Sequence, residues 1–184
     1  AVNSGSIQLD QYTQPFGPEC LERLDELCTK HQTSRFVILV ALLNVLLYRY
    51  TNRKDIVVGF DTAGRISNDI EPLVGYTLNT LCLRTAIDPT HNFAQLVKQA
   101  AGKTGAALDH QAYPFAQLLA EMQMQDKNKE RSLFDVLVLY QNFYAETEEI
   151  RFNDCEIQRE PVFIREGFVN LLLDITENGQ GLDF

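Results

Sequence analysis

The sequence of 184 residues contains no tryptophan, only three histidines and four cysteines, and fewer positive than negative charges. Lysine and arginine total 16 whereas aspartate and glutamate total 25, so the formal net charge is −9. Binding to the phosphates of a nucleic acid needs concentrated cations, and no cluster of them stands out along the chain. Nucleic acid is therefore not predicted as a partner, and the same sign of charge disfavours an anionic membrane surface.

The cysteines, Cys20, Cys28, Cys82 and Cys155, form no C-x-x-C pair and have no histidine at the spacing of zinc ligands. If Cys20 and Cys28 share a helix, they lie about 12 Å apart along its axis, which is too far for a disulfide bond. We therefore expect free, buried thiols in a reducing compartment and no metal site.

Export and membrane signals are missing from the part of the sequence where they would be sought. Residues 1–10 contain no basic region followed by an apolar one. The longest apolar run, residues 36–48, is shorter than the roughly 20 residues that span a bilayer. The expected location is the cytoplasm.

Catalytic motifs are absent too. The sequence contains no G-x-S-x-G, no G-x-G-x-x-G and no Walker loop, so neither a nucleophile elbow nor a nucleotide site is predicted. His31 and His91 fall in predicted turns and are expected to be solvated. Asp109 does not orient the ring of His110, because side chains of neighbouring residues diverge, so a structural role is expected for His110. The residues alone predict no catalytic group.

Hydrophobic periodicity predicts alternating strands and helices in the first two thirds of the chain and mainly strands in the last third. Helices are predicted from Pro18, over 35–50, over 91–108 and from Pro114, and strands over 7–12, 56–58, 78–85, 134–140, 155–158 and 168–176. This order predicts an α/β fold, a two-layer sandwich with a mixed β-sheet. Pro15 is expected to break the first strand, and Asn178-Gly179 is a hairpin-turn signal.

Three connections can be predicted in more detail. The helix at 35–50 is apolar nearly all round, so it should run through the centre of the fold, with Ser34 as its N-cap. Thr90 is the expected N-cap of the helix at 91–108. Residues 59–72 form a polar, glycine-containing loop that is long enough to suggest a function.

The strand after this loop presents two faces. Leu81 and Leu83 share one face with Asn79, whereas Cys82 and Arg84 lie on the other. Asn79 is therefore expected to be buried and bonded to backbone groups, with contact to a substrate as the alternative. Arg84 is expected to anchor a carboxylate across the sheet.

Several segments stand together in the register of a known family: DIVVG at 55–59, AGR at 63–65, VGYTLNTLCLR at 74–84, HQAYPF at 110–115 and LFDV at 133–136. In order and spacing they resemble the second half of the condensation domains of nonribosomal peptide synthetases. The resemblance extends over about residues 7–184.

The resemblance implies that residues 1–184 form a single lobe with the fold of chloramphenicol acetyltransferase, the carboxy-terminal half of a condensation domain. In that family two lobes enclose a tunnel, where amide bonds form between acyl and aminoacyl thioesters that carrier proteins present on phosphopantetheine arms. The family's His-His-x-x-x-Asp-Gly motif, assigned to the amino-terminal lobe, does not occur in this sequence. The implied partners are that lobe and peptidyl carrier proteins; no cofactor is bound directly, and this chain alone is expected to be inactive.

The resemblance also implies site residues. Arg65, Asn79, Arg84, Gly59 and Gly75 are candidates for the tunnel wall or the lobe interface. Arg65 is expected to contact the partner lobe or a pantetheine phosphate, and the alternative is a solvated surface arginine.

A second group of residues, His110, Tyr113, Pro114 and Phe115, is expected to start and pack a helix. Two alternative functions remain open: a non-catalytic lobe that scaffolds carrier proteins, and an epimerisation domain of the same fold, which the stretch 79–81 fits less well. A lobe separated from its partner exposes apolar surface and strand edges, so self-association of the isolated chain is also expected.

Overall fold

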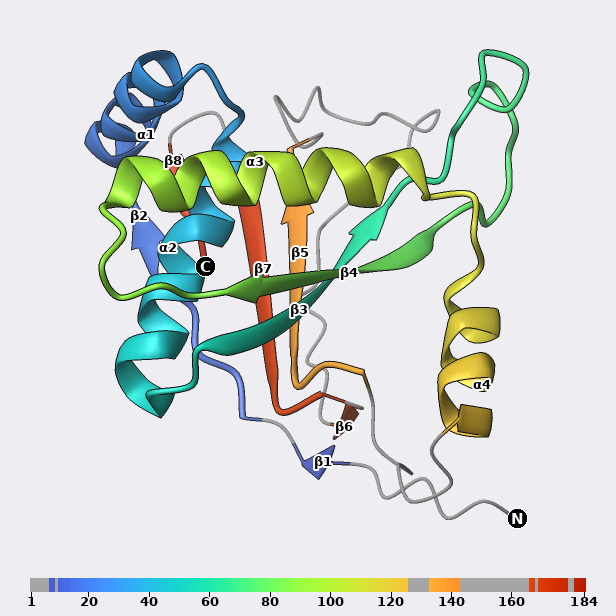
Figure 1. Ribbon diagram of the computed structural model, residues 1–184. Helices are drawn as coiled ribbons and strands as arrows, with labels where there is room; N and C mark the ends of the chain where they lie inside the picture. The colour runs from blue at the N-terminus through green and yellow to red at the C-terminus, as the bar shows by residue number, and fades with distance from the viewer. Residues whose placement is uncertain (1–6, 9, 126–132, 143–165, 168, 179–180) are drawn as a thin grey trace, which may run out of the picture.

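Three helices cover one face of a six-stranded mixed sheet in the computed structural model of the chain, which describes residues 7–8, 10–125, 133–142, 166–167, 169–178 and 181–184 (Figure 1). The helices on this face are α1 (Pro18–His31), α2 (Arg35–Thr51) and α3 (Phe93–Asp109), and a fourth, α4 (Phe115–Gln125), stands apart at one end of the sheet. The predicted α/β sandwich with a mixed sheet is confirmed.

The sheet has the order β2-β8-β7-β5-β3-β4. Its strands are β2 (Pro15–Phe16), β8 (Gly181–Asp183), β7 (Leu171–Asn178), β5 (Val136–Gln141), β3 (Asp55–Thr62) and β4 (Asn79–Ala86). The central pairs β3–β5 and β5–β7 are parallel and the others antiparallel. A separate pair joins β1 (Ile7–Gln8) to β6 (Glu166–Gly167).

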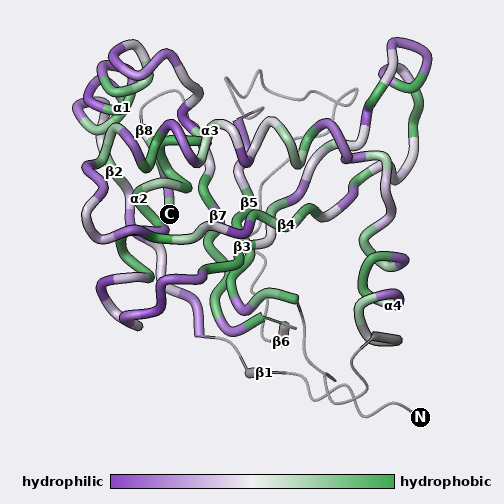
Figure 2. The backbone as a smooth tube through the Cα atoms, in the orientation of Figure 1, coloured by the Kyte–Doolittle hydropathy of each residue, from purple (hydrophilic) through white to green (hydrophobic). Residues whose placement is uncertain are grey.

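The core lies between the sheet and the helices. It includes side chains that are at most 1% exposed, among them Ile38, Val58, Val138, Ile175 and Leu182. Figure 2 shows the hydrophobic stretches of β3, β5 and β7 side by side in the middle of the sheet. Burial of each such side chain contributes about 1.5–3 kcal/mol relative to exposure, so this layer supplies most of the favourable free energy of folding.

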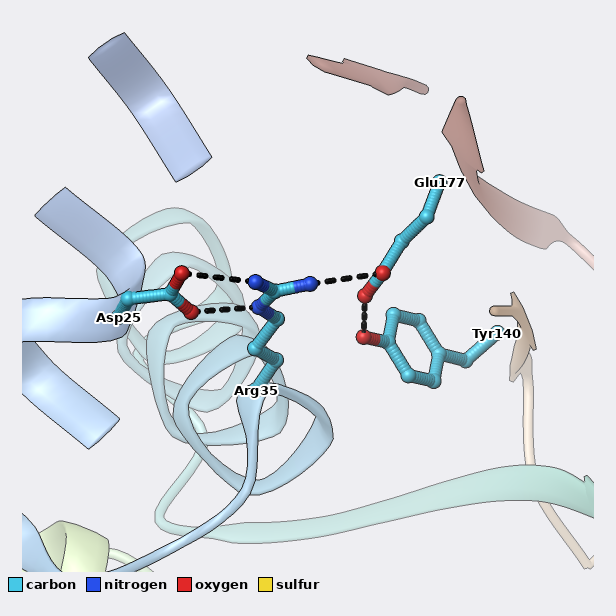
Figure 3. A network of polar contacts seen from close by, with 4 residues as sticks. All are labelled: Asp25, Arg35, Tyr140 and Glu177. Carbon is cyan, nitrogen blue, oxygen red and sulfur yellow. Dashed lines mark hydrogen bonds and ion pairs between the residues drawn. The ribbon is translucent and has the colours of Figure 1, made fainter. Parts of the chain in front are cut away.

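A charged network joins the helix layer to the sheet (Figure 3). Arg35, at the start of α2, donates two hydrogen bonds to Asp25 of α1 at 2.6 and 2.7 Å and one to Glu177 of β7 at 2.7 Å. Tyr140 of β5 donates its hydroxyl to the other oxygen of Glu177. The hydrogen bonds from Arg35 lower the pKa of Asp25, whereas burial and the neighbouring Glu177 raise the pKa of Tyr140.

Two of the predicted helix N-caps can be compared with the structure. Ser34 accepts a hydrogen bond from the backbone of Val37, which confirms it as the N-cap of α2. The cap predicted at Thr90 is wrong, because Asn92 and Gln95 form a capping box at the start of α3, two residues later than expected. Thr90 bonds instead to the carboxylate of Asp88 in the preceding turn.

Several strand boundaries differ from the predictions. The polar loop predicted to begin at Gly59 begins after Thr62, because Gly59 and Phe60 are buried and continue β3. Residues 10–14 form no strand, and Pro15, predicted as a breaker, begins the edge strand β2 instead.

The ends of the chain give mixed outcomes. The hairpin predicted at residues 178–179 is confirmed, since β7 and β8 pair Asn178 with Gly181. The strand predicted at 155–158 lies outside the described residues.

Among the described residues, no single helix is both long enough and apolar enough to span a membrane. Helices α1 and α2 meet these criteria only together, as a pair bent by 98°.

The prediction that α2 runs through the centre of the fold is only half correct. One side of the helix is core, with Ile38 and Ala41 at 0% exposure. The other side is open, because no described element covers Leu42, Leu46 and Tyr50, which are 44%, 51% and 85% exposed. The composition of the helix could not distinguish these two sides, since both are apolar.

Candidate functional site

A projecting loop, residues 63–78, joins the end of β3 to the start of β4 (Figure 1). Its two ends are tied together, because Thr77 donates its hydroxyl to the carbonyl of Ala63 at 2.8 Å. Gly64 has a φ of +63°, and a Cβ atom there would collide with the carbonyl oxygen of Thr77. Both the positive φ and the short distance to Thr77 require glycine at this position. The AGR motif therefore allows the two ends of the loop to lie close together.

Arg65 braces the loop through hydrogen bonds to its backbone. Its Nη1 atom donates to the carbonyl oxygens of Ile70, Glu71 and Leu73 at 2.9, 2.5 and 3.0 Å. A guanidinium group that binds three carbonyls holds residues 70–73 in one turn, although the side chain is exposed. This bracing was not foreseen, and the predicted contact of Arg65 with a partner lobe or a phosphate stays a prediction.

Apolar side chains cover the outside of this loop. Five are about half exposed or more: Ile66 at 52%, Leu73 at 54%, Val74 at 104%, Tyr76 at 88% and Leu78 at 48%. A rigid loop with so many exposed apolar groups is typical of a surface that another protein segment covers. Gly75 lies among them with open space around it, so no packing constraint in the described residues requires glycine there.

Asn79 joins the base of the loop to the turn between α3 and α4. Its Nδ2 atom donates to the carbonyls of Gln111 and Tyr113 at 2.9 and 2.8 Å, and its Oδ1 atom accepts from the backbone of Phe115 at 3.0 Å. The side chain thus caps α4 from a distant strand. These bonds agree with the expectation that Asn79 serves backbone groups, although it is half-buried rather than buried; contact with a substrate stays a prediction.

The HQAYPF segment forms this turn. His110 ends α3, its carbonyl accepts from the backbone of Tyr113 at 3.0 Å, and its side chain is exposed. Pro114 immediately precedes α4, as expected, and its carbonyl accepts the first helical hydrogen bonds. The hydroxyl of Thr62 donates to Oε1 of Gln111 at 2.9 Å, a link from β3 that sequence reasoning missed.

Phe115 anchors the start of α4. Its ring lies 5.6 Å from the ring of Phe134, which is 2% exposed. The ring of Phe134 also covers Gly59, where an added Cβ would come within 2.5 Å of Cε2 and 2.7 Å of Cε1. Gly59 is therefore required by packing under Phe134, whereas a place for it in the tunnel wall stays a prediction.

Arg84 and Asp55 pair across β3 and β4. The guanidinium group donates two parallel hydrogen bonds to the carboxylate, at 2.9 and 2.7 Å, and lowers the pKa of Asp55. The expected link from Arg84 to a carboxylate across the sheet is therefore present. Both side chains are exposed, so the pair fixes geometry more than it adds stability.

The cysteines that the structure describes form no disulfide bond. Cys20, Cys28 and Cys82 are free and partly buried, and Cys155 lies outside the described residues. Burial raises the pKa of Cys82 to about 11, so its thiol stays protonated at neutral pH. The described part of the chain contains no group of three or more residues able to hold a metal ion.

Comparison with known proteins settles the family. The family model named "Condensation domain" matches residues 1–181. The chain belongs to the condensation-domain family. It is 31% identical over 182 residues to tyrocidine synthase 2 of Brevibacillus parabrevis, and 33% identical over 168 residues to tyrocidine synthase 3 of the same organism.

The solved condensation domains agree with the fold. The condensation domain from monacolin K polyketide synthase superposes with a TM-score of 0.78 at 18% identity, covering 94% of this chain and 40% of that one. The matches to tyrocidine synthases 2 and 3 cover 97% and 91% of this chain but only 5% and 3% of those proteins. The chain therefore spans a small part of its curated relatives and less than half of a solved condensation domain.

Proposed function

We propose that this chain is one half of a condensation domain and forms one wall of the tunnel in which an amide bond joins two carrier-bound substrates. The observation that carries the proposal is the loop at 63–78, which exposes apolar side chains. Arg65 braces this loop, and Gly64 and Thr77 hold its two ends together. The rest of the domain is the natural cover for that surface, because a solved condensation domain is more than twice as long as the matched segment.

The reaction needs positioning more than it needs this chain's titratable groups. The amine of the acceptor attacks the carbonyl carbon of the donor thioester; the C–N bond forms, the C–S bond breaks, and the thiol of phosphopantetheine leaves. Alignment of two tethered substrates can supply several kcal/mol, since effective molarities of well-oriented reactions reach about 10⁵–10⁸ M. We assign this alignment to both walls, and the transfer of the amine proton to the half that carries the His-His-x-x-x-Asp-Gly motif.

In this scheme Arg65 and Asn79 are positioning residues. Arg65 holds the loop that meets the other lobe, and Asn79 sets the angle between β4 and α4. A pantetheine phosphate near Arg65 is part of the proposal, because only Nη1 of its guanidinium group bonds to the loop carbonyls. Phosphopantetheine arrives on carrier proteins, and no cofactor is bound directly.

The proposal is tested with the full-length protein and with the 184-residue chain. Carrier domains are loaded with a donor and an acceptor aminoacyl group, and the amide product on the acceptor carrier is measured by mass spectrometry. The full-length protein should form the product, and the chain alone should not. Product formation by the chain alone would refute the division of labour between two halves.

A variant separates the lobe interface from folding. Val74→Asp together with Tyr76→Asp should leave the unfolding midpoint of the chain unchanged, because both side chains are exposed, but should lower product formation by the full-length protein at least tenfold. Tyr12→Asp, at a tyrosine that is 81% exposed and lies outside the loop, is the control.

A lobe that scaffolds carrier proteins without catalysis is the alternative that the same assay separates. Carrier binding by the full-length protein, without amide product from any substrate pair, would replace the first proposal by this one.

A further inference from the structure

The start of α2 contacts three neighbouring parallel strands near their carboxyl ends. The ring centroid of Phe36 lies 5.1 Å from that of Phe60 in β3 and 5.9 Å from that of Tyr140 in β5. Arg35, the preceding residue, donates a hydrogen bond of 2.7 Å to Glu177, near the end of β7. Strands β3, β5 and β7 are adjacent and parallel, so their carboxyl ends meet at one edge of the sheet.

Two hydrogen bonds to one carboxylate hold this edge together (Figure 3). One oxygen of Glu177 accepts from Arg35, and the other accepts from the hydroxyl of Tyr140. Burial and the neighbouring Glu177 raise the pKa of Tyr140, so its hydroxyl keeps its proton and remains a donor at neutral pH. Because Glu177 belongs to β7 and Tyr140 to β5, the bond between them ties the ends of the two strands.

The same strand ends also carry side chains that face away from α1, α2 and α3. Successive residues of a strand point to opposite faces of the sheet, so Leu139 and Gln141 lie on the side away from Tyr140. The amide of Gln141 donates to both oxygens of Asp174 in β7, at 2.8 and 3.0 Å. The loop at 63–78 leaves the sheet at this edge too, since it follows β3. A displacement of the end of β5 therefore moves Leu139 and Gln141 relative to the loop.

We propose that Tyr140 is a positioning residue for the condensation reaction. Its bond to Glu177, which Arg35 holds in turn, fixes the end of β5. Leu139 and Gln141 are thereby kept where the tunnel wall meets the acyl group of a carrier-bound substrate. The inference rests on the proposed function and names the part of the sheet that forms the wall. Helices α1, α2 and α3 occupy one side of the sheet, so the other side, with the loop, is left for the substrates (Figure 1).

The reaction is sensitive to such positioning, although Tyr140 lies on the far side of the sheet. A misplacement of about 1 Å can lower the rate of an aligned reaction by about 10²-fold. Tyr140→Phe keeps the ring that contacts Phe36 and removes only the hydroxyl. One oxygen of the mostly buried Glu177 then loses its donor, so the two strand ends are no longer tied through it.

Asp25 offers a matched control, because it belongs to the other end of the same network. It accepts two hydrogen bonds from Arg35, and these bonds join α1 to α2 rather than to the sheet. Asp25→Ala therefore weakens the helix layer and leaves the bonds from Arg35 and Tyr140 to Glu177 in place. A role of the network in stability alone would make the two variants alike.

The test uses the full-length protein with loaded donor and acceptor carriers. The kcat and the KM for the acceptor carrier are measured for wild type, Tyr140→Phe and Asp25→Ala, and amide hydrogen exchange is followed over residues 18–31 and 136–141. Tyr140→Phe should lower kcat about tenfold at an unchanged KM and accelerate exchange over 136–141. Asp25→Ala should accelerate exchange over 18–31 instead, with kcat within about twofold of wild type.

Three results would overturn the positioning role: an unchanged kcat in Tyr140→Phe, an equal loss of kcat in Asp25→Ala, or faster exchange over both segments in Tyr140→Phe, which would mark a general loss of stability. Any of these, together with product from the wild type, leaves the proposed function standing. A wild-type protein that forms no product from any substrate pair rejects the proposed function, and the positioning role is rejected with it.

Discussion

Gly59→Ala should destabilise the protein because there is no room for a methyl group under Phe134. The added Cβ would lie 2.5 and 2.7 Å from two atoms of a ring that is 2% exposed. Contacts this short force a buried ring to move, and overpacking of a core costs about 1–3 kcal/mol. The lower entropy of alanine in the unfolded chain offsets about 0.4–1 kcal/mol of this.

We therefore expect a net loss of about 1 kcal/mol in the free energy of unfolding, or about 2–4 °C in the melting temperature of a chain this long. Urea unfolding followed by circular dichroism measures it directly, and the absence of tryptophan rules out the usual fluorescence signal. Gly75→Ala is the matched control, because the added methyl group meets nothing within 4 Å. It should change stability by less than about 0.5 kcal/mol.

A double mutant shows whether Phe134 is the cause. Phe134→Leu removes the ring atoms that a Cβ at Gly59 would meet, so the two substitutions together should cost about 1 kcal/mol less than their sum. If Gly59→Ala is neutral, or if the two effects simply add, the reasoning about this contact is wrong.

Three further predictions concern other parts of the fold. Asn79→Ala should cost about 2 kcal/mol, because three hydrogen bonds of about 0.5–1.5 kcal/mol each are lost. It should also accelerate hydrogen exchange at the amide of Phe115, and Asn79→Asp should restore only part of that protection. Arg35→Met should cost about 2 kcal/mol, since it leaves the mostly buried Glu177 without its cation. The folded-state pKa of Asp25 is lowered, so the stability that Asp25 contributes is present at neutral pH and is lost as the pH falls through that pKa. The acid unfolding curves of wild type and variant should therefore converge. The isolated chain should self-associate through its exposed apolar groups, and a monomer in sedimentation at high concentration would contradict this.

Much of the fold could be predicted because its elements have strong periodicity. The sequence shows the apolar faces of α1 and α3 and the β-branched run of β3, and the structure has a helix or a strand at each of these places. Boundaries were less predictable where two rules compete. At Thr90 and Asn92 both residues are good caps, and the choice depends on the bond between Thr90 and Asp88. At Gly59 a glycine that suggested a loop belongs to a strand, because a distant ring covers it.

The candidate site was predictable only in part, for a related reason. The segments around Arg65, Asn79 and Phe115 could be found from their order along the chain, but their roles depend on contacts between residues far apart in sequence. Nothing near Asn79 indicates that it caps a helix 36 residues later. The bonds from Arg65 to carbonyls of its own loop were not foreseen either, and its expected contact with a partner lobe or a phosphate stays a prediction.

These contacts also suggest how the loop at 63–78 is held relative to the sheet. The loop and α4 are joined through Asn79 and Gln111, so a force on one reaches the other at the end of β3. Helix α2 leads into the opposite end of that strand and is anchored to the sheet by Arg35 and Glu177. Because β3 is an inner strand that pairs with both β4 and β5, it is a stiff spacer between the two ends. The orientation of the loop therefore depends on the sheet, which is the property that a wall of the proposed tunnel needs.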